Sequence, residues 1–274
     1  REKFRALPEA PAAPAGAPPA KPAAGLYEIM PANHRLPYEI GEIITRLFDE
    51  GNYREFQPEY APELLCAEAR LEGRPVGIIA NRRGILRTAE GPRIGGIVYT
   101  ESARKVAYFV DMAERAALPL VYLQDVSGFM VGAEAEAGGI IRAGAEMVET
   151  MACATVPKFV LTLNHASGAG YYAMAGQGFD PSFTFSWPTA RIGVMEGDAA
   201  VQAVHGNAPP GPQTQQAIEK TRADYERWLD ALYAAARGHC DAVIDPVDSR
   251  AVLTLALEVA AYSGRRRNLV LETL

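Results

Sequence analysis

The sequence has few of the residues that most often build metal and disulfide sites. Its 274 residues include three cysteines and four histidines. Cys66, Cys153 and Cys240 are odd in number and widely spaced, which suits reduced thiols in a cytoplasm and predicts no disulfide framework. The histidines are His34, His165, His205 and His239. Neither set has the spacing of metal ligands, so we expect no metal site.

Signals for membranes, export and nucleic acid are also missing. No apolar run approaches the length of a membrane span, and the start, Arg1 to Phe4, has no apolar signal-peptide segment. The formal net charge of −6 argues against a general binder of nucleic acid or of membrane surfaces. These absences predict a cytoplasmic protein. The first residue is not Met, which leaves open a fragment or a processed subunit of something larger.

The common catalytic signatures are absent as well. There is no phosphate-binding loop and no G-x-G-x-x-G after a strand. Ser167 lies two residues after His165, but the stretch from His165 to Ala169 lacks both glycines of the G-x-S-x-G nucleophile elbow. A serine nucleophile is therefore disfavoured, and we expect His165 to line a site or form a hydrogen bond rather than to act as a base. Catalysis by backbone donors is what remains.

The most informative stretch present is Val156 to Gly178, which combines a strand, a turn of small residues and a helix. A buried strand is expected from Lys158 to Leu163, the turn from Ala166 to Gly170, and the helix from Tyr171 to Ala175. Small residues let backbone approach a ligand, and the first N–H groups of a helix lack partners. The pattern fits donors aimed at a developing negative oxygen and, equally, an ordinary tight α/β turn.

A second stretch is built in the same way. Leu120 to Leu123 predicts a buried strand, Gln124 to Gly132 a turn, and Ile140 to Met151 a helix with one apolar face. Taken alone, this stretch favours an ordinary turn. Two such units in tandem suggest two donor sites in one cleft.

The rest of the chain alternates strands with helices, which predicts βα units and a largely parallel sheet. Strands are expected at 63–70, 75–81 and 182–187, with 95–98 as a candidate extension of the same sheet. Helices are expected at 38–48, 100–117, 199–204, 215–237 and 249–262. The Pro/Ala tract from Pro8 to Pro22 reads as an extended linker, so residues 1–30 are assigned to a linker and residues 31–274 to one α/β domain.

Five stretches together resemble one protein family. They are Pro31–Ile40 (PANHRLPYEI), Leu123–Gly132 (LQDVSGFMVG), Ala166–Gly176 (ASGAGYYAMAG), Phe185–Met195 (FSWPTARIGVM) and Ala242–Arg250 (AVIDPVDSR). The combination resembles the biotin-dependent acyl-CoA carboxyltransferases. It is most similar to β subunits of the methylcrotonyl-CoA carboxylase type and to α subunits of glutaconyl-CoA decarboxylases. Each motif alone is weak, but all occur in order and with matching spacing.

The resemblance implies a crotonase-like (ClpP/crotonase) fold and the C-terminal, biotin-side half of a two-domain subunit. In that family, carboxybiotin releases CO₂, and backbone N–H groups stabilise the oxyanion left on biotin. By motif, Ala169 and Gly170 match the catalytic donor pair, and Gly128 and Phe129 match the other turn of the same cleft. The residues implied to contact biotin are Ser167, Gly168, Tyr171 and Val131.

The resemblance also implies partners. Biotin would arrive on a carrier protein or domain, and an N-terminal carboxyltransferase half or subunit would hold the acyl-CoA in a homo- or hetero-oligomer. The expected function is transfer of a carboxyl group between carboxybiotin and an acyl-CoA. A glutaconyl-CoA-type decarboxylase and a non-catalytic assembly module are the alternatives. Glu196-Gly197-Asp198 stands where such carboxylases usually have Gly-Gly-Glu or Gly-Gly-Gln, which leaves the acyl substrate open.

Overall fold

A mixed sheet forms the centre of the molecule in this computed structural model, which describes residues 15–88 and 91–263. Its strands follow the order β1-β2-β3-β7-β9-β10-β12, and β11 pairs with β9. They are β1 (Tyr53–Phe56), β2 (Leu64–Leu71), β3 (Arg74–Asn81), β7 (Leu120–Val126), β9 (Lys158–Ser167), β10 (Phe183–Ser186), β11 (Arg191–Gly193) and β12 (Ala242–Val243). β1, β2 and β3 are antiparallel and all other pairings are parallel. The predicted, largely parallel sheet is confirmed.

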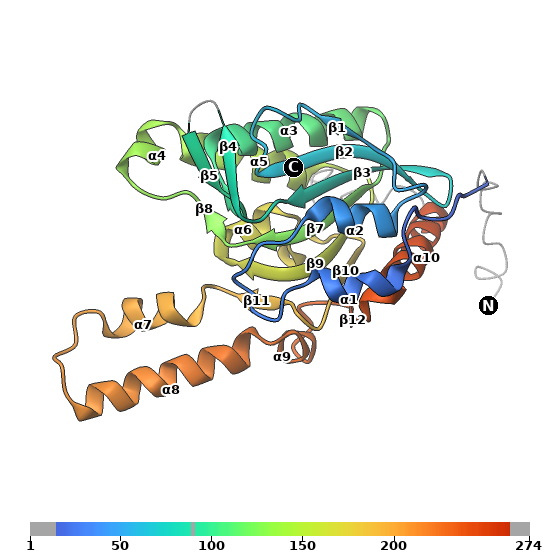
Figure 1. Cartoon of the computed structure of the whole chain (residues 1–274). Coiled ribbons are helices and arrows are strands. Elements are labelled where there is room, and N and C mark those ends of the chain that lie inside the picture. The colour runs from blue at the N-terminus through green and yellow to red at the C-terminus, as the bar shows by residue number, and fades with distance from the viewer. Residues whose placement is uncertain (1–14, 89–90, 264–274) are drawn as a thin grey trace, which may run out of the picture.

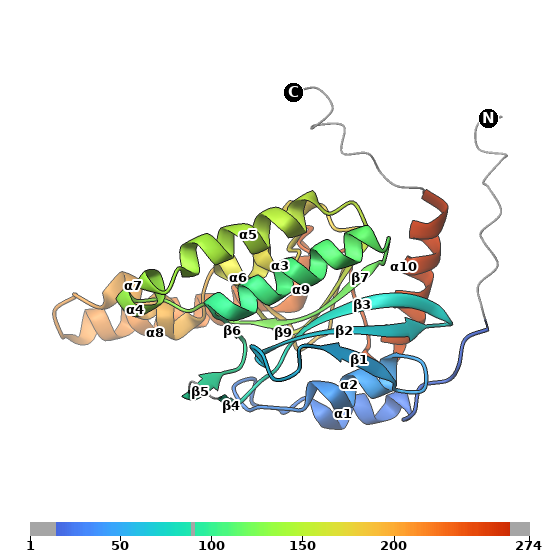
Figure 2. The same ribbon diagram turned by 90° about the horizontal axis from the view of Figure 1, so that it is seen from above.

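Helices cover both faces of this sheet. The α-helices of the described residues are α1 (Leu26–Ile29), α2 (Ile40–Leu47), α3 (Thr100–Arg115), α4 (Ala133–Ala137), α5 (Ile140–Cys153), α6 (Gly168–Ala173), α7 (Gly197–His205), α8 (Pro212–Leu229), α9 (Ala231–Ala235) and α10 (Ser249–Ser263). Helices α3 and α5 lie on one side, and α1 and α2 lie on the other, with α10 at the sheet's end (Figures 1 and 2). Among the described residues, no helix is both long enough and apolar enough to cross a bilayer.

The central strands are buried on both faces, as expected for parallel strands between helical layers. Every residue of β7 and of β9 is buried. Successive side chains point to opposite faces, so Val121 and Leu123 join the cluster under α2 and α10, while Tyr122 joins the cluster under α3 and α5. This packing fixes the carboxyl ends of β7 and β9, where the candidate site lies.

The segment from Gly95 to Val98 does not extend the main sheet, and the prediction that it could is wrong. Its strand β6 (Ile97–Val98) pairs in parallel with β8 (Gly128–Phe129) in a separate small sheet. The reason is the positive φ of +81° at Gly96, which turns the chain toward the second turn. There the Gly96 carbonyl accepts from Ser127 N–H at 2.7 Å. A further hairpin joins β4 (Ile85–Thr88) to β5 (Gly91–Ile94).

The start of the packed fold lies inside the segment assigned to a linker. Residues 1–14, which include part of the predicted tract, lie outside the described residues. None of residues 15–25 is buried. Leu26, however, is fully buried, and Ile29 and Met30 pack against the same core cluster. The core therefore takes in residues 26–30 because this short helix carries apolar side chains toward α2.

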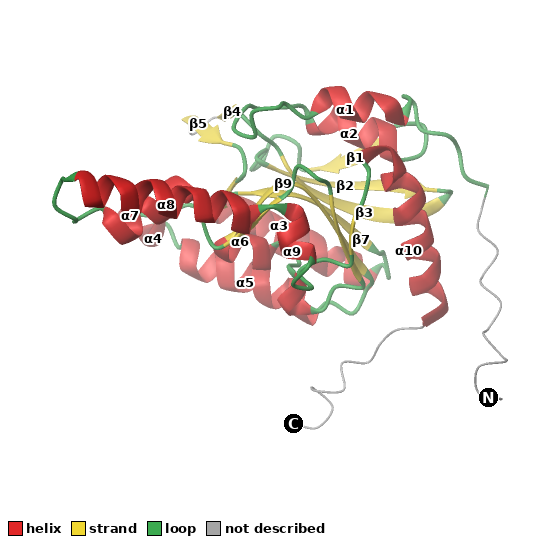
Figure 3. Cartoon of the chain, turned by 90° about the horizontal axis from the view of Figure 1, so that it is seen from below, coloured by secondary structure: helices red, strands yellow, loops and turns green. Residues whose placement is uncertain are grey.

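Helices α7 and α8 form a hairpin that projects from the body of the molecule (Figures 1 and 3). One continuous helix was predicted over 215–237, and this is wrong at Asp230. That residue has φ −59° and ψ 138°, and its side chain accepts from the N–H groups of Leu232 and Tyr233. Asp230 therefore ends α8 and caps the start of α9, as a short acidic side chain does at a helix N-terminus.

Candidate functional site

The two strand–turn–helix units meet at the carboxyl ends of β7 and β9. These strands are paired in parallel, with Val126 opposite Ala166. A Cβ built on Gly170 would lie 2.6 Å from a Val126 methyl carbon and 3.0 Å from the Cα of Gly128. Such a separation leaves no room for a side chain. The structure therefore brings Gly170 and Gly128 into direct contact, and only glycine fits at position 170.

Helix α6 begins at Gly168, three residues before the predicted start at Tyr171. Gly168 has φ +52°, and a Cβ there would lie 3.0 Å from the Val194 carbonyl oxygen, so the turn strongly favours glycine. Ala169 and Gly170 consequently fall in the first turn, where N–H groups have no acceptor within the helix. Gly170 is buried and Ala169 is exposed. A ligand can therefore approach this end of α6 at Ala169.

The predicted residues of the second turn have contrasting surroundings. Phe129 is half-buried and packs against the cluster of α3 and α5. The Phe129 ring would lie 3.1 Å from a Cβ built on Gly144 of α5, so this ring packs closely on α5 and fixes the turn onto that helix. Val131 is 80% exposed. The side chain of Phe129 therefore anchors the turn, whereas that of Val131 is free to meet a ligand or a partner.

Ser167 and Tyr171 flank the other turn. Ser167 is 4% exposed, and its buried hydroxyl has no hydrogen-bond partner among the described residues. The Tyr171 hydroxyl accepts from Gln177 N–H at 2.9 Å, and its carbonyl accepts from the Gln124 amide at 3.1 Å. Tyr171 thus stabilises the loop after α6, while the Ser167 hydroxyl makes no hydrogen bond to the described residues.

A buried carboxylate, Asp125 at the end of β7, organises the polar groups beside these turns. It has no exposed side-chain surface. Its carboxylate accepts from the Tyr38 hydroxyl at 2.9 Å, from His165 N–H at 3.0 Å and from His165 Nδ1 at 3.1 Å. Arg83 Nε lies 3.5 Å away. Burial and the adjacent Asp125 together raise the pKa of Tyr38 well above its usual value, so Tyr38 acts as a donor here.

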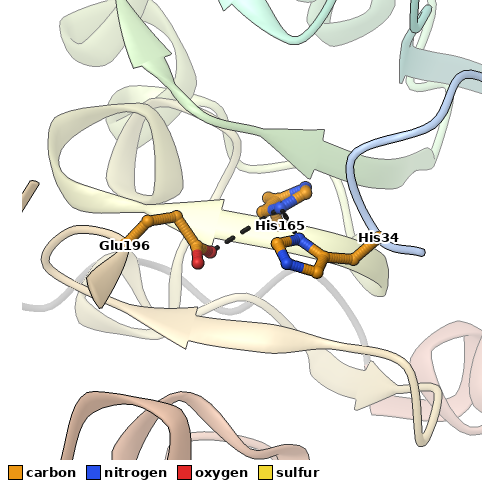
Figure 4. Close-up of side chains that lie close together, drawn as sticks. All are labelled: His34, His165 and Glu196. Carbon is orange, nitrogen blue, oxygen red and sulfur yellow. Dashed lines mark hydrogen bonds and ion pairs between the residues drawn. The ribbon is translucent and has the colours of Figure 1, made fainter. Parts of the chain in front are cut away.

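This arrangement fixes the tautomer of His165. A carboxylate can only accept, so Nδ1 of a neutral His165 carries the proton and Nε2 carries a lone pair. Nε2 faces His34 Nδ1 at 2.8 Å and a Glu196 carboxylate oxygen at 3.6 Å. Figure 4 shows the three side chains pointing toward one another, His34 from the loop before α2 and Glu196 from the loop after β11. The three ligand-type atoms lie within 4.8 Å of one another.

Arg191 on β11 holds the acidic side of this cluster. It lies opposite His165 in the strand register and bonds Glu196 at 2.8 Å and Glu226 at 2.9 Å. Burial opposes the charge of Arg191, but its hydrogen bonds to both carboxylates raise its pKa. Burial and the nearby charge of Arg191 lower the pKa of His34. A neutral imidazole is therefore favoured at position 34.

Sequence reasoning did not connect these residues. His34 and Glu196 both occurred in stretches singled out above, the first within Pro31–Ile40 and the second as a departure from the family pattern. His34 and His165 are 131 residues apart, so no spacing rule could pair them. The residues expected on the biotin side were assigned by motif at two local glycine turns, and their contact with biotin stays a prediction.

Comparison with known proteins identifies the family. The family model described as the carboxyl transferase domain matches residues 2–270. The chain belongs to the carboxyl transferase family. It is 38% identical over 255 residues to the biotin-dependent 3-methylcrotonyl-coenzyme A carboxylase beta1 subunit of Mycobacterium tuberculosis, which covers 89% of this chain and 46% of the relative. It is 34% identical to the methylmalonyl-CoA carboxyltransferase 12S subunit of Propionibacterium freudenreichii, covering 88% of the chain and 45% of that subunit.

Solved structures of the carboxyl transferase family share the fold. The β subunit of geranyl-CoA carboxylase from P. aeruginosa superposes with a TM-score of 0.83 at 32% identity, over 94% of this chain and 48% of the subunit. Transcarboxylase 12S, described as a hexamer, gives a TM-score of 0.81 at 32% identity, over 95% of this chain and 48% of that chain. The crotonase-like fold is confirmed. This chain spans less than half the length of these relatives, and each of the four is named as a carboxylase, a carboxyltransferase or a transcarboxylase.

Proposed function

We propose that this chain is the biotin side of an acyl-CoA carboxyltransferase, which moves a carboxyl group between carboxybiotin and an acyl-CoA. Membership of the carboxyl transferase family supports the reaction class, and the names of the relatives support biotin and an acyl-CoA as reactants. The observation that carries the proposal is the contact between Gly170 and Gly128, which joins both predicted turns at one point. A single ligand can then reach the donors of both turns.

The turn before α6 suits a ring oxygen that gains negative charge. Residues 166–171 contain no charged side chain, so nothing on the turn competes for its N–H groups. The N–H groups of Ala169 and Gly170 would donate to that oxygen, and the low polarity around them strengthens each bond. The Ser167 hydroxyl is buried behind this turn, so it would meet the ligand only if the turn shifts. Carboxybiotin, when bound, supplies the carboxyl group that is transferred.

The acyl-CoA side is proposed to come from an N-terminal carboxyltransferase half or a partner subunit, and biotin from a carrier protein or domain. Several large apolar side chains are exposed, and where such side chains form one contiguous patch they mark an interface. They include Ile141 (71%), Tyr172 (49%), Trp228 (41%) and Leu232 (67%). We infer a homo- or hetero-oligomer, and we retain the sequence-based expectation of a cytoplasmic protein.

The test removes one backbone donor and leaves its neighbours in place. In Ala169→Pro the N–H is lost, and proline is tolerated in the first turn because that N–H has no partner within the helix. Losing one oxyanion donor should lower transfer of labelled carboxyl from carboxylated biotin carrier to acyl-CoA by about 10²- to 10³-fold. Ala169→Gly keeps the N–H and is the matched control, with an activity close to that of the parent.

Ser167→Ala completes the set, because it removes a hydroxyl but no backbone donor. It should lower the rate by at most about tenfold, well below the usual effect of an acid or base. A folded Ala169→Pro with full activity would refute the backbone-donor proposal. An inactive Ser167→Ala beside an active Ala169→Pro would instead make Ser167 the reacting group.

A further inference from the structure

We propose that His34, His165 and Glu196 bind one divalent transition-metal ion, through His34 Nδ1, His165 Nε2 and a carboxylate oxygen. Two imidazoles and one carboxylate form a donor set used by Zn²⁺ and by Fe²⁺ in proteins. The sequence predicts no metal site, because its cysteines and histidines lack the spacing of metal ligands. In the fold, their three atoms converge within 4.8 Å of one another.

Two of the three separations are close to those of ligands on one ion. Ligand atoms about 2.1 Å from an ion lie roughly 2.9 to 3.4 Å apart when the angle at the ion is about 90° to 110°. The observed separations are 2.8 Å between the two imidazole nitrogens and 3.6 Å between His165 Nε2 and Glu196. His34 Nδ1 and the Glu196 oxygen are separated by no more than 4.8 Å, so one of these two side chains has to move by up to roughly 1.4 Å for all three atoms to reach one ion.

Each ligand is held by an outer partner, as in established metal sites. Asp125 accepts from His165 Nδ1 at 3.1 Å, which directs the lone pair of Nε2 at the proposed ion. Arg191 orients Glu196 at 2.8 Å. The backbone of His34 is fixed by the Asn164 amide, which donates to its carbonyl at 2.8 Å. Two of the ligand side chains are therefore oriented by a partner, and the third, His34, is held at its backbone.

Charges of both signs surround the proposed ion: Arg191 and Arg35 oppose its charge, and the carboxylates of Glu196 and Asp125 favour it. The guanidinium of Arg191, which lies nearest to the acidic ligand, is shared between two carboxylates, Glu196 and Glu226. The fully buried carboxylate of Asp125 adds a further negative charge behind His165. The side chain of Glu196 is 26% exposed, so water can reach the open coordination positions that three protein ligands leave. The rival occupant is a single proton shared by the two imidazoles.

Calorimetric titration of chelator-treated protein with Zn²⁺ at neutral pH tests the proposal. We expect one saturable site per chain. His34→Ala and Glu196→Gln should each weaken Zn²⁺ binding by at least about tenfold, because removing only a residue that hydrogen-bonds a ligand already lowers metal affinity by that much. His239→Ala removes an exposed histidine away from the cluster and should bind as the parent does. Cys153→Ser removes the exposed thiol and serves as a second control.

Both ligand variants lie at partly exposed positions, so the folded state should persist, and circular dichroism of the metal-free proteins checks it. Co²⁺ titration adds a second readout, since its visible absorption should appear in the parent and in His239→Ala and be lost in His34→Ala. Absence of a saturable site would overturn the proposal in favour of the shared proton. Zn²⁺ binding that is equal in the parent and in both ligand variants would also overturn it.

Discussion

Replacing Gly170 by alanine tests the contact on which the candidate site depends. The added methyl would lie 2.6 Å from a Val126 methyl carbon and 3.0 Å from the Cα of Gly128. The Val126 side chain can shift, but the backbone of Gly128 can move only with the whole second turn. Overpacking of this kind costs about 1 to 3 kcal/mol. For a domain of this size we expect the melting temperature to fall by roughly 2 to 12 °C.

The effect on the reaction should exceed the effect on folding. Separating the turns displaces the donors of α6 by a fraction of an ångström or more, and a misplacement near 1 Å can lower a rate by about 10²-fold. The assay is carboxyl transfer from carboxylated biotin carrier to acyl-CoA, run beside a thermal melt. Gly41→Ala is the control, because a Cβ there meets only the Tyr53 hydroxyl at 3.4 Å, an ordinary contact. A Gly170→Ala protein with parental stability and rate would refute the close approach of the two turns.

Two further predictions concern stability and assembly. Burial opposes the charge of Asp49, but hydrogen bonds from Arg250 and from the N–H groups of Gly73, Ala17 and Glu72 outweigh it and hold the pKa of Asp49 below its usual value. A lowered pKa stabilises the fold above about pH 4 and ceases to do so as the pH falls further. Asp49→Asn should therefore lower the free energy of unfolding in urea by about 2 kcal/mol at pH 7 and by less at pH 3. Asp111→Asn, at an exposed ion pair, is the control and should change it little. An equal loss for Asp49→Asn at both pH values would contradict this. The exposed apolar side chains on α5, α6 and α8 predict at least a dimer by light scattering at micromolar concentration, and a monomer there would count against the proposed oligomer.

The sequence predicted those parts of the fold that depend on local patterns. The strands β7 and β9, the helix α5 and the glycine turns follow from runs of apolar or small residues, and the structure has them. The break at Asp230 was missed because an aspartate within a helical pattern is also common on an exposed helix face. The turn from Gly168 to Gly170 was predictable because it is local, and its role as a site stays a prediction. The cluster of His34, His165 and Glu196 was not predictable, because it depends on the register of β11 on β9 and on the docking of the loop before α2 against β9.

The network around Asp125 has a consequence for how the molecule forms. Tyr38 reaches Asp125 across 87 residues of chain, and His34 reaches His165 across 131. Closing such long loops is entropically unfavourable until other contacts support them, and distant pairings form slowly. The helices and both apolar clusters should therefore consolidate first and the polar centre last. A preparation that has regained its helical signal can still lack a competent site, so recovery after denaturation has to be judged by turnover rather than by secondary structure.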